Sequence, residues 1–250
     1  MTDHPYRDPI LYDLEYDHLG EDIAFYTDLA RRLPGPVTEL GCGNGRILIP
    51  IARAGVTIHG IDSSAPMLAD LARKLTQESP GVRQRATWHQ GDFGSVAGPC
   101  ALVLWPFNAL HYVPGPEALV DTLRLVRNAL RDDGVLALDC YLPDPALYAR
   151  EPLLRPEVRT DLHPVTGEAL RSWQEGWWDA AQRVHHVVYV WQHADGHQTR
   201  LHNPLQMYDL AELHALLARA GFRVHREAED FSGSPVRSTS VTWVAELRPT

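Results

Sequence analysis

Hydrophobic and polar positions alternate along the chain in a pattern that predicts strands separated by helices. Five short apolar runs before residue 142 have the length and composition of strands: 37–40, 56–61, 86–90, 101–105 and 135–139. Apolar residues recur at helical spacing between these runs, most clearly over 116–130. The run at 101–105 is unbroken, as expected for a central parallel strand that is buried on both faces. This order predicts a parallel, doubly wound α/β sheet.

The pattern changes on either side of this unit. A helical segment is expected over residues 10–33, because Pro34-Gly35-Pro36 would end it. Beyond several prolines that follow residue 142, alternating runs predict an antiparallel sheet over 169–177, 183–193 and 197–206. The last two runs are joined by Ala194-Asp195-Gly196, which is typical of a hairpin.

A helical pattern at 209–220 and strand patterns at 222–225 and 241–247 complete the chain. We therefore predict one seven-stranded, Rossmann-like α/β domain formed by residues 1–142 and 207–250. An antiparallel β-sheet at 143–206 is predicted to be inserted into it.

Composition limits the classes of function. The chain is 44% hydrophobic and 22% charged, which is ordinary for a soluble globular protein. Its formal charge of −9 argues against nucleic acid as a partner, because phosphate contacts need clustered Lys and Arg. No run of about 18 apolar residues is present, so we expect no membrane span, and no signal peptide is evident.

Cysteines and histidines give no pattern of metal ligands. Cys42, Cys100 and Cys140 lie far apart, which favours a reduced, cytoplasmic protein and no zinc site. The inserted segment is rich in histidine, but neighbouring strand residues point to opposite faces. No compact ligand set emerges, so we expect solvent-facing sheet positions and no bound metal for His185, His186, His193, His197 and His202.

The stretch from residue 37 to residue 62 carries the clearest chemical signal. Gly41-Cys42-Gly43-Asn44-Gly45 follows the first strand and precedes a helical pattern. Glycines allow a ligand to approach the backbone, and a helix N-terminus offers free N–H groups. Asp62 ends the next strand, about 20 residues after the first glycine, where a carboxylate can accept both hydroxyl protons of a ribose. This unit therefore predicts a site for a nucleoside-containing cofactor.

The spacing of the glycines separates two cofactor classes. The dinucleotide fingerprint is G-x-G-x-x-G, whereas Arg46 occupies the sixth position here and Gly45 comes one residue early. A nicotinamide-dependent oxidoreductase is therefore the weaker alternative. A protein that binds a cofactor without catalysis is a second alternative.

Several motifs together resemble class I S-adenosylmethionine-dependent methyltransferases. These are Glu39 to Gly45, Asp62, Gly91-Asp92-Phe93 after the third strand, and Pro106-Phe107-Asn108 after the fourth. The paired tyrosines Tyr12 and Tyr16 and the β-rich insertion are similar to small-molecule enzymes of the glycine N-methyltransferase and sugar N-methyltransferase types.

The resemblance implies the class I methyltransferase fold, S-adenosylmethionine as cofactor and S-adenosylhomocysteine as product. It also implies in-line methyl transfer to an N or O atom of a small-molecule acceptor, which the inserted sheet would cover. A homodimer is left open.

The resemblance also implies roles for particular residues. The glycine turn would pass under the methionine and ribose, Asp62 would hold the ribose hydroxyls, and Asp92 would accept from the adenine amine. The full implied cofactor set is Tyr12, Tyr16, Glu39, Gly41, Cys42, Gly43, Gly45, Asp62, Ser63, Met67, Gly91, Asp92, Phe93, Phe107 and Asn108. For catalysis we expect His111 as a base or acceptor-orienting group, together with Asn108 and Tyr16.

Overall fold

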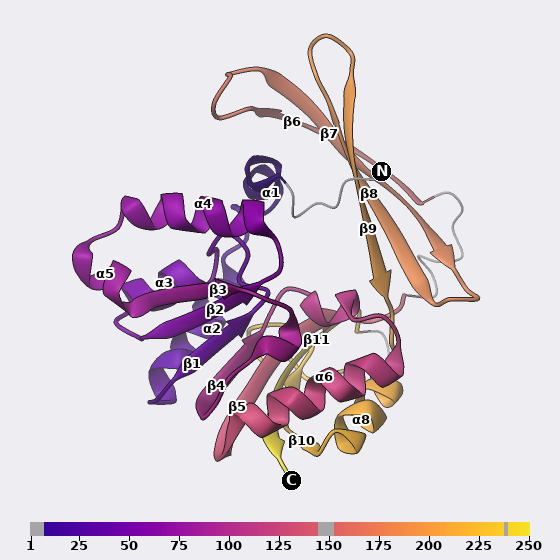
Figure 1. The fold of residues 1–250 in the computed structure, drawn as a ribbon. Coiled ribbons are helices and arrows are strands. Elements are labelled where there is room, and N and C mark those ends of the chain that lie inside the picture. Colours follow the sequence, from indigo (N-terminus) through magenta and orange to yellow (C-terminus); the bar gives the residue numbers. More distant parts are fainter. Residues whose placement is uncertain (1–7, 145–152, 238–239) are drawn as a thin grey trace.

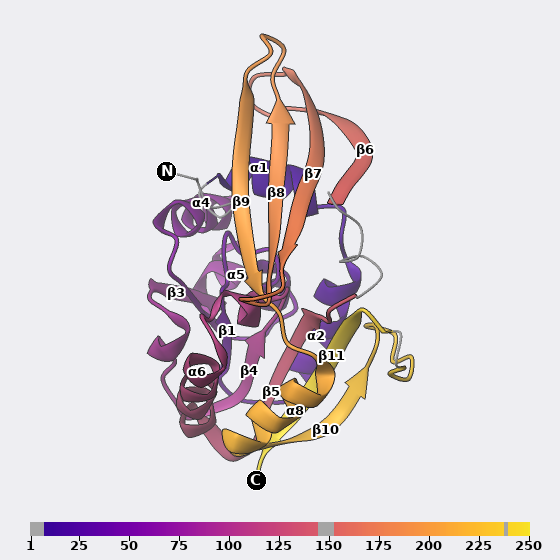
Figure 2. The ribbon, with the colours of Figure 1, turned by 90° about the vertical axis from the view of Figure 1, so that its right-hand side faces the viewer.

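The computed structural model describes residues 8–144, 153–237 and 240–250. Figures 1 and 2 show a large central sheet with helices on both faces and a smaller sheet that projects from one end of it. The central sheet has seven strands in the order β10-β11-β5-β4-β1-β2-β3. Their bounds are β1 Val37–Leu40, β2 Ile58–Asp62, β3 Ala86–Gln90, β4 Cys100–Trp105, β5 Leu130–Tyr141, β10 Phe222–Ala228 and β11 Thr242–Pro249.

The first five strands are parallel, while β11 is antiparallel to both β5 and β10. The helices are α1 Pro9–Tyr16, α2 Glu21–Arg32, α3 Leu48–Arg53, α4 Ala65–Thr76, α5 Pro80–Arg85, α6 Pro116–Ala129 and α8 Leu210–Arg219, with 3-10 turns η2 Phe93–Ser95 and η3 Ala109–Tyr112. None of the helices in the described ranges is long and apolar enough to cross a membrane.

The unbroken apolar strands are explained by two separate cores, one on each face of the sheet. Val103 and Trp105 of β4 pack with α6 and α8, whereas Leu102 and Leu104 of the same strand pack with α2, α3 and α4. Since successive strand residues point to opposite faces, a strand covered on both faces needs apolar residues at every position. The predicted α/β fold with seven strands is thus confirmed.

The inserted sheet has four strands in the order β6-β7-β8-β9, all antiparallel. They are β6 Leu153–Leu162, β7 Ala169–Asp179, β8 Val184–Gln192 and β9 Gln198–Gln206. The sequence predicted the last three and missed β6. Its pairing with β7 is irregular between Arg155 and Arg159, around Pro156. Proline cannot donate a ladder hydrogen bond and is confined to edges and bulges, so the strand pattern is weak there.

The N-terminal helical segment consists of two helices, α1 and α2, and α1 lies between the two sheets. Leu11 of α1 packs against Leu170, Tyr189 and Trp191 of the inserted sheet. On its other side, Asp13 forms an ion pair of 2.7 Å with Lys74 of α4. The helix therefore connects the inserted sheet to the carboxyl end of the central sheet, where the glycine turn lies.

Candidate active site

The glycine turn after β1 is held in place by the carboxylate at the end of β2. Gly41, Gly43 and Gly45 all have positive φ angles, of 72°, 53° and 90°. One oxygen of Asp62 accepts a hydrogen bond of 2.8 Å from the Gly43 N–H, and the other accepts one of 2.7 Å from the Ser64 N–H. Burial raises the pKa of Asp62, and these two hydrogen bonds lower it. Asp62 thus orients the turn and keeps lone pairs for a ligand.

Two side chains predicted to bind the cofactor pack against this turn. Met67 of α4 is fully buried, and a Cβ added to Gly43 would lie 3.3 Å from its terminal methyl group. A Cβ added to Gly41 would lie 3.4 Å from the ring of Phe93. Cys42 is also buried. Side chains therefore pack closely against Gly41 and Gly43, and a ligand at this turn would contact mainly the backbone.

The third strand ends beside Asp62. The N–H of Gly91 donates a hydrogen bond of 3.0 Å to the backbone carbonyl of Asp62. Asp92 is exposed and accepts a hydrogen bond of 3.0 Å from the Ser95 hydroxyl. Ser63 is exposed, and Ser64 rather than Ser63 caps α4 through a contact of 3.5 Å with the Met67 N–H. The ends of β1, β2 and β3 therefore bring Gly41, Asp62 and Asp92 to one edge.

Glu39 of β1 carries a buried acceptor without a partner. Its side chain is buried, and its Oε2 atom has no hydrogen-bond partner in the structure. Burial raises the pKa of Glu39 well above its usual range, and the nearby Arg46 guanidinium opposes this rise. An unpaired buried carboxyl oxygen is costly to the fold, and a ligand with a hydrogen-bond donor would satisfy it.

The turn after β4 is strained and enclosed by aromatic rings. Phe107 and Asn108 both have positive φ angles, of 58° and 60°, which non-glycine residues seldom adopt. The Phe107 ring lies 4.8 Å from the Tyr16 ring and 4.4 Å from the Arg46 guanidinium. Arg46 in turn forms a buried ion pair with Asp22 of α2. Tyr12, which lies 4.9 Å from Tyr16, completes this cluster.

Asp139, which holds the strained turn, was not among the residues predicted from the sequence. Its carboxylate accepts hydrogen bonds of 2.8 Å from the Phe107 N–H and 2.6 Å from the Tyr26 hydroxyl. Its backbone carbonyl accepts one of 3.2 Å from the Asn108 N–H. Burial raises the pKa of Asp139 to about 6, against the effect of its hydrogen bonds. The only signal in the sequence was an acidic residue near the carboxyl end of an otherwise apolar strand.

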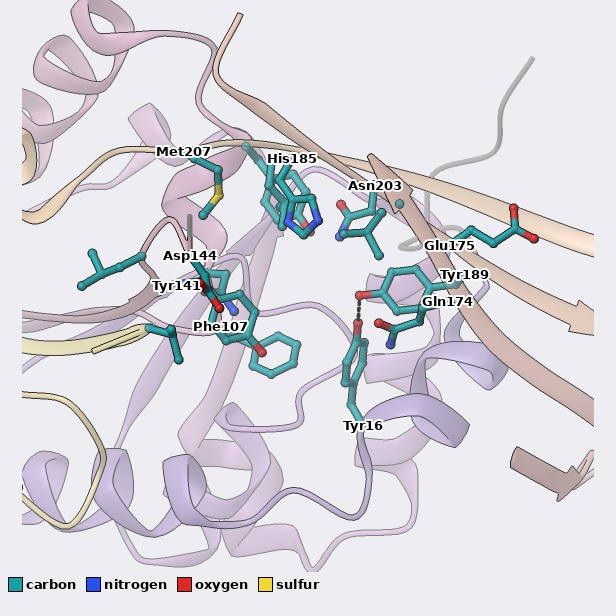
Figure 3. Close-up of a pocket in the computed structure, with 17 residues that line it drawn as sticks. Tyr16, Phe107, Tyr141, Asp144, Gln174, Glu175, His185, Tyr189, Asn203 and Met207 are labelled. Atoms are coloured by element: carbon teal, nitrogen blue, oxygen red, sulfur yellow. Dashed lines mark hydrogen bonds between the residues drawn. The ribbon is translucent and has the colours of Figure 1, made fainter. Parts of the chain in front are cut away.

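A cavity of about 270 Å³ lies between the strained turn and the inserted sheet (Figure 3). Tyr16 closes one side, and its hydroxyl lies 2.6 Å from that of Tyr189 on β8. The described lining residues are Tyr16, Phe107, Asn108, Tyr112, Tyr141, Leu142, Asp144, Gln174, Glu175, Gly176, His185, Val187, Tyr189, Asn203, Leu205, Met207 and Val241. His185 lines this cavity, so the prediction that all five histidines of the insertion face solvent is wrong for that residue.

His111 lies beside the cavity but is not among its lining residues. It is buried, and its ring nitrogens lie 2.7 Å from the Gln206 carbonyl oxygen and 3.1 Å from the Tyr141 carbonyl oxygen. Burial lowers the pKa of His111 to about 4, although both carbonyl contacts raise it. Because both nitrogens face backbone carbonyls, this arrangement suits a residue that joins β5 to the end of β9.

Comparison with known proteins identifies a methyltransferase domain in this chain. Residues 38–136 match the family model described as a methyltransferase domain. A putative methyltransferase of Bacillus subtilis (strain 168), YqeM, is 22% identical over 204 residues, which cover 79% of this chain and 77% of YqeM.

Two solved structures share the fold over nearly the whole chain. The CcbJ methyltransferase from Streptomyces caelestis is 23% identical, with a TM-score of 0.76 over 92% of this chain and 94% of that one. The sugar N-methyltransferase KedS8 from Streptoalloteichus sp. ATCC 53650 is 21% identical, with a TM-score of 0.69 over 96% of this chain and 93% of that one.

This chain is a methyltransferase with the Rossmann-like fold of class I enzymes. Its cofactor is S-adenosylmethionine, which is converted to S-adenosylhomocysteine. The chemistry of the methyltransferase site fits that cofactor, since the unpaired Glu39 oxygen suits an ammonium group and the glycine turn allows close approach of a ligand. The nicotinamide alternative is set aside, because the family model that matches the glycine turn and Asp62 is that of a methyltransferase domain.

Proposed function

We propose that this methyltransferase transfers a methyl group to an amine nitrogen of a small polar molecule such as an amino sugar. The observation that carries the proposal is the character of the cavity wall. The described lining residues include Asp144 and several aromatic rings, and they include no Lys or Arg, whereas the Glu175 carboxylate points away from the cavity and pairs with Arg200. Carboxylates and aromatic faces both attract a cationic amine. The sugar N-methyltransferase activity named for KedS8 agrees with this assignment.

The volume of the cavity supports a small acceptor. At about 270 Å³ it is close to the lower end of ligand-binding pockets, which are typically about 300 Å³ or larger. We propose that residues 143–206 form a cap over this acceptor site, because β7, β8 and β9 contribute one of its walls. Tyr16 would close the junction between the cap and the cofactor side.

The cofactor side is assigned from the strand ends. We propose that Asp62 holds the ribose hydroxyls, that Glu39 receives the amino group of the methionine part, and that Asp92 meets the adenine amine. The remaining members of the site would be Gly41, Cys42, Gly43, Gly45, Ser63, Met67, Gly91 and Phe93. The rings of Tyr12, Tyr16 and Phe107, together with Asn108, would separate the two ligands at the point of transfer.

Bound S-adenosylmethionine supplies an electrophilic methyl group on a positively charged sulfur. The task of the protein is to hold the acceptor nitrogen about 3–3.5 Å from the methyl carbon, in line with the carbon–sulfur bond, and to exclude water. We assign this positioning to Tyr16 and Asn108. An amine that arrives protonated must first lose a proton, and His185 is the imidazole that lines the cavity. His111 would act indirectly, by holding Tyr141 and Gln206.

Isotope transfer from labelled S-adenosylmethionine tests the proposal. The acceptor panel contains methyl glycosides of amino hexoses, each paired with the neutral hexose that has a hydroxyl in place of the amine. We expect label in at least one amino compound and none in its hydroxyl partner. Label only in hydroxyl compounds, or in none of the panel while the cofactor is bound, would contradict the proposal. Heat-denatured enzyme corrects for uncatalysed transfer.

A further inference from the structure

Asn203 of β9 is a polar residue at a position that packing would fill with an apolar one. Leu201 and Leu205 flank it on the same face of the strand, and all three are buried. Its side chain is only 4% exposed, and its Oδ1 atom has no hydrogen-bond partner in the structure. A buried carbonyl oxygen without a partner destabilises a fold, and most such groups in proteins are satisfied. The packing of the inserted sheet does not account for this oxygen.

The amide of Asn203 contacts Tyr189. Burial raises the pKa of Tyr189 to about 12, and hydrogen bonds from Tyr16 and Asn203 oppose that rise. Because the Asn203 oxygen has no partner, the amide nitrogen is the donor in the contact with Tyr189. The tyrosine hydroxyl is itself 2.6 Å from the Tyr16 hydroxyl. This chain of contacts turns the amide oxygen away from the tyrosines.

The amide lies on the wall of the acceptor cavity. Asn203 pairs directly with Val187 of β8, which lines the same cavity. Figure 3 shows Asn203 between His185 and Tyr189 on the cap side, facing the turn that carries Phe107 across the cavity. The residue with the unpaired oxygen therefore lines the cavity in which the molecule that receives the methyl group would lie, and that oxygen can accept a hydrogen bond.

We propose that Asn203 is a specificity-determining residue whose amide oxygen accepts a hydrogen bond from an N–H or O–H group of the methyl acceptor. The assignment rests on the proposed function, because it places the acceptor in this cavity. A site with a buried acceptor rejects molecules that lack the matching donor, since the oxygen would then stay desolvated and unpaired. Asn203 thus selects polyfunctional polar molecules over simple alkyl amines, which have no donor group besides the reacting nitrogen.

Binding to the enzyme saturated with S-adenosylhomocysteine tests this role without turnover. The probes are the methyl glycosides of amino hexoses, titrated by calorimetry into the wild type, Asn203→Leu and Asn203→Asp. We expect Asn203→Leu to weaken probe binding at least tenfold, with its affinity for S-adenosylhomocysteine unchanged within twofold. Asn203→Asp keeps an acceptor oxygen and should bind the amino probes within threefold of the wild type. Gln198→Leu, which removes an exposed amide from the same strand, is the matched control.

Thermal unfolding separates a binding role from a structural one. Asn203→Leu removes an unpaired buried carbonyl, which destabilises the fold, together with the amide contact with Tyr189, which stabilises it, so its melting temperature should stay close to that of the wild type. Equal probe affinity in wild type and Asn203→Leu would overturn the assignment of Asn203. A lower melting temperature together with weaker S-adenosylhomocysteine binding would also overturn it, since Asn203 would then be structural. If the wild type binds S-adenosylhomocysteine but none of the probes, the proposed amine acceptor is wrong instead.

Discussion

The carboxylate of Asp139 accepts a hydrogen bond of 2.8 Å from the backbone N–H of Phe107. Thirty-two positions separate the two residues in the chain, and β4 and β5 bring them together as parallel neighbours. The bond holds Phe107 in a left-handed conformation that is otherwise unfavourable for a bulky residue. The position of the aromatic ring between the cofactor side and the acceptor cavity therefore depends on a buried acid.

Asp139 should make stability depend on pH in the weakly acidic range. Its pKa is about 6 in the fold, against about 3.9 in an unfolded chain. Between these values the folded state binds more protons than the unfolded state, so stability falls as pH rises from 4 to 6 and is level above that. We expect the wild type to lose about 2–3 kcal/mol relative to Asp139→Asn over this range. Urea unfolding at pH 4 to 7 measures it.

The exposed Asp132→Asn variant on the same strand is the control for that experiment, and its curve should parallel the wild type. Parallel curves for the wild type and Asp139→Asn would show that Asp139 does not titrate in this range.

Asp62→Ala should weaken cofactor binding and loosen the glycine turn together. The change removes acceptors of the Gly43 and Ser64 N–H groups as well as the proposed partner of the ribose. Hydrogen bonds to a charged group contribute about 1.5–3 kcal/mol each, so we expect affinity for S-adenosylmethionine to fall by roughly 10- to 150-fold. Asp62→Asn, which keeps one acceptor oxygen, should lose less. Calorimetry with S-adenosylhomocysteine as competitor measures the affinity of both variants. Asp121→Ala, at an exposed position of α6, is the control. Unchanged affinity in Asp62→Ala would remove this residue from the site.

Glu39 should release a proton when the cofactor binds. Burial raises its pKa well above the usual range, and an ammonium group beside it favours the ionised form. Below that raised pKa the carboxyl must lose a proton before it can pair, so affinity should increase with pH. Titrations in two buffers with different heats of ionisation should detect release in the wild type and not in Glu39→Gln, whose affinity should be roughly tenfold lower. Exposed Glu21→Gln should behave as the wild type. Equal proton release in wild type and Glu39→Gln would place the ammonium elsewhere.

Replacement of His111 should affect stability more than the pH dependence of catalysis. Its pKa of about 4 in the fold lies below the value near 6.5 expected when unfolded, so its contribution to stability is present above pH 6.5 and is lost as pH falls toward 4. His111→Asn keeps a donor for the Gln206 carbonyl, and its rate profile between pH 6 and 9 should keep the wild-type shape. In the His185→Asn variant, the rise in rate with pH that reports deprotonation of the methyl acceptor should disappear from this profile. If a stably folded His111→Asn variant lost this rise in rate with pH, His111 would be the general base.

Local patterns in the sequence were sufficient for the framework. Periodicity located all seven strands of the central sheet. The signal is clearest for inner strands such as β4, which is apolar throughout because both of its faces are covered, whereas the edge strands β3 and β10 carry exposed polar residues. The glycine turn, Asp62 and Gly91–Phe93 predicted the cofactor site for a related reason. These motifs lie at successive strand ends, and parallel strands bring their carboxyl ends to one edge, so their spacing in the chain implies their proximity.

The acceptor side was decided by tertiary structure alone. Tyr16 and Tyr189 are 173 positions apart, and their contact depends on how the inserted sheet docks on α1. Asn203 is distinguishable from an exposed strand residue only through the register of β9 with β8, since a shift by one residue would turn it to the other face. Asp139 likewise gains its role from the neighbouring strand. Thus sequence alone determined the fold and the methyl donor, whereas the acceptor cavity arises from contacts between distant segments, which local periodicity does not specify.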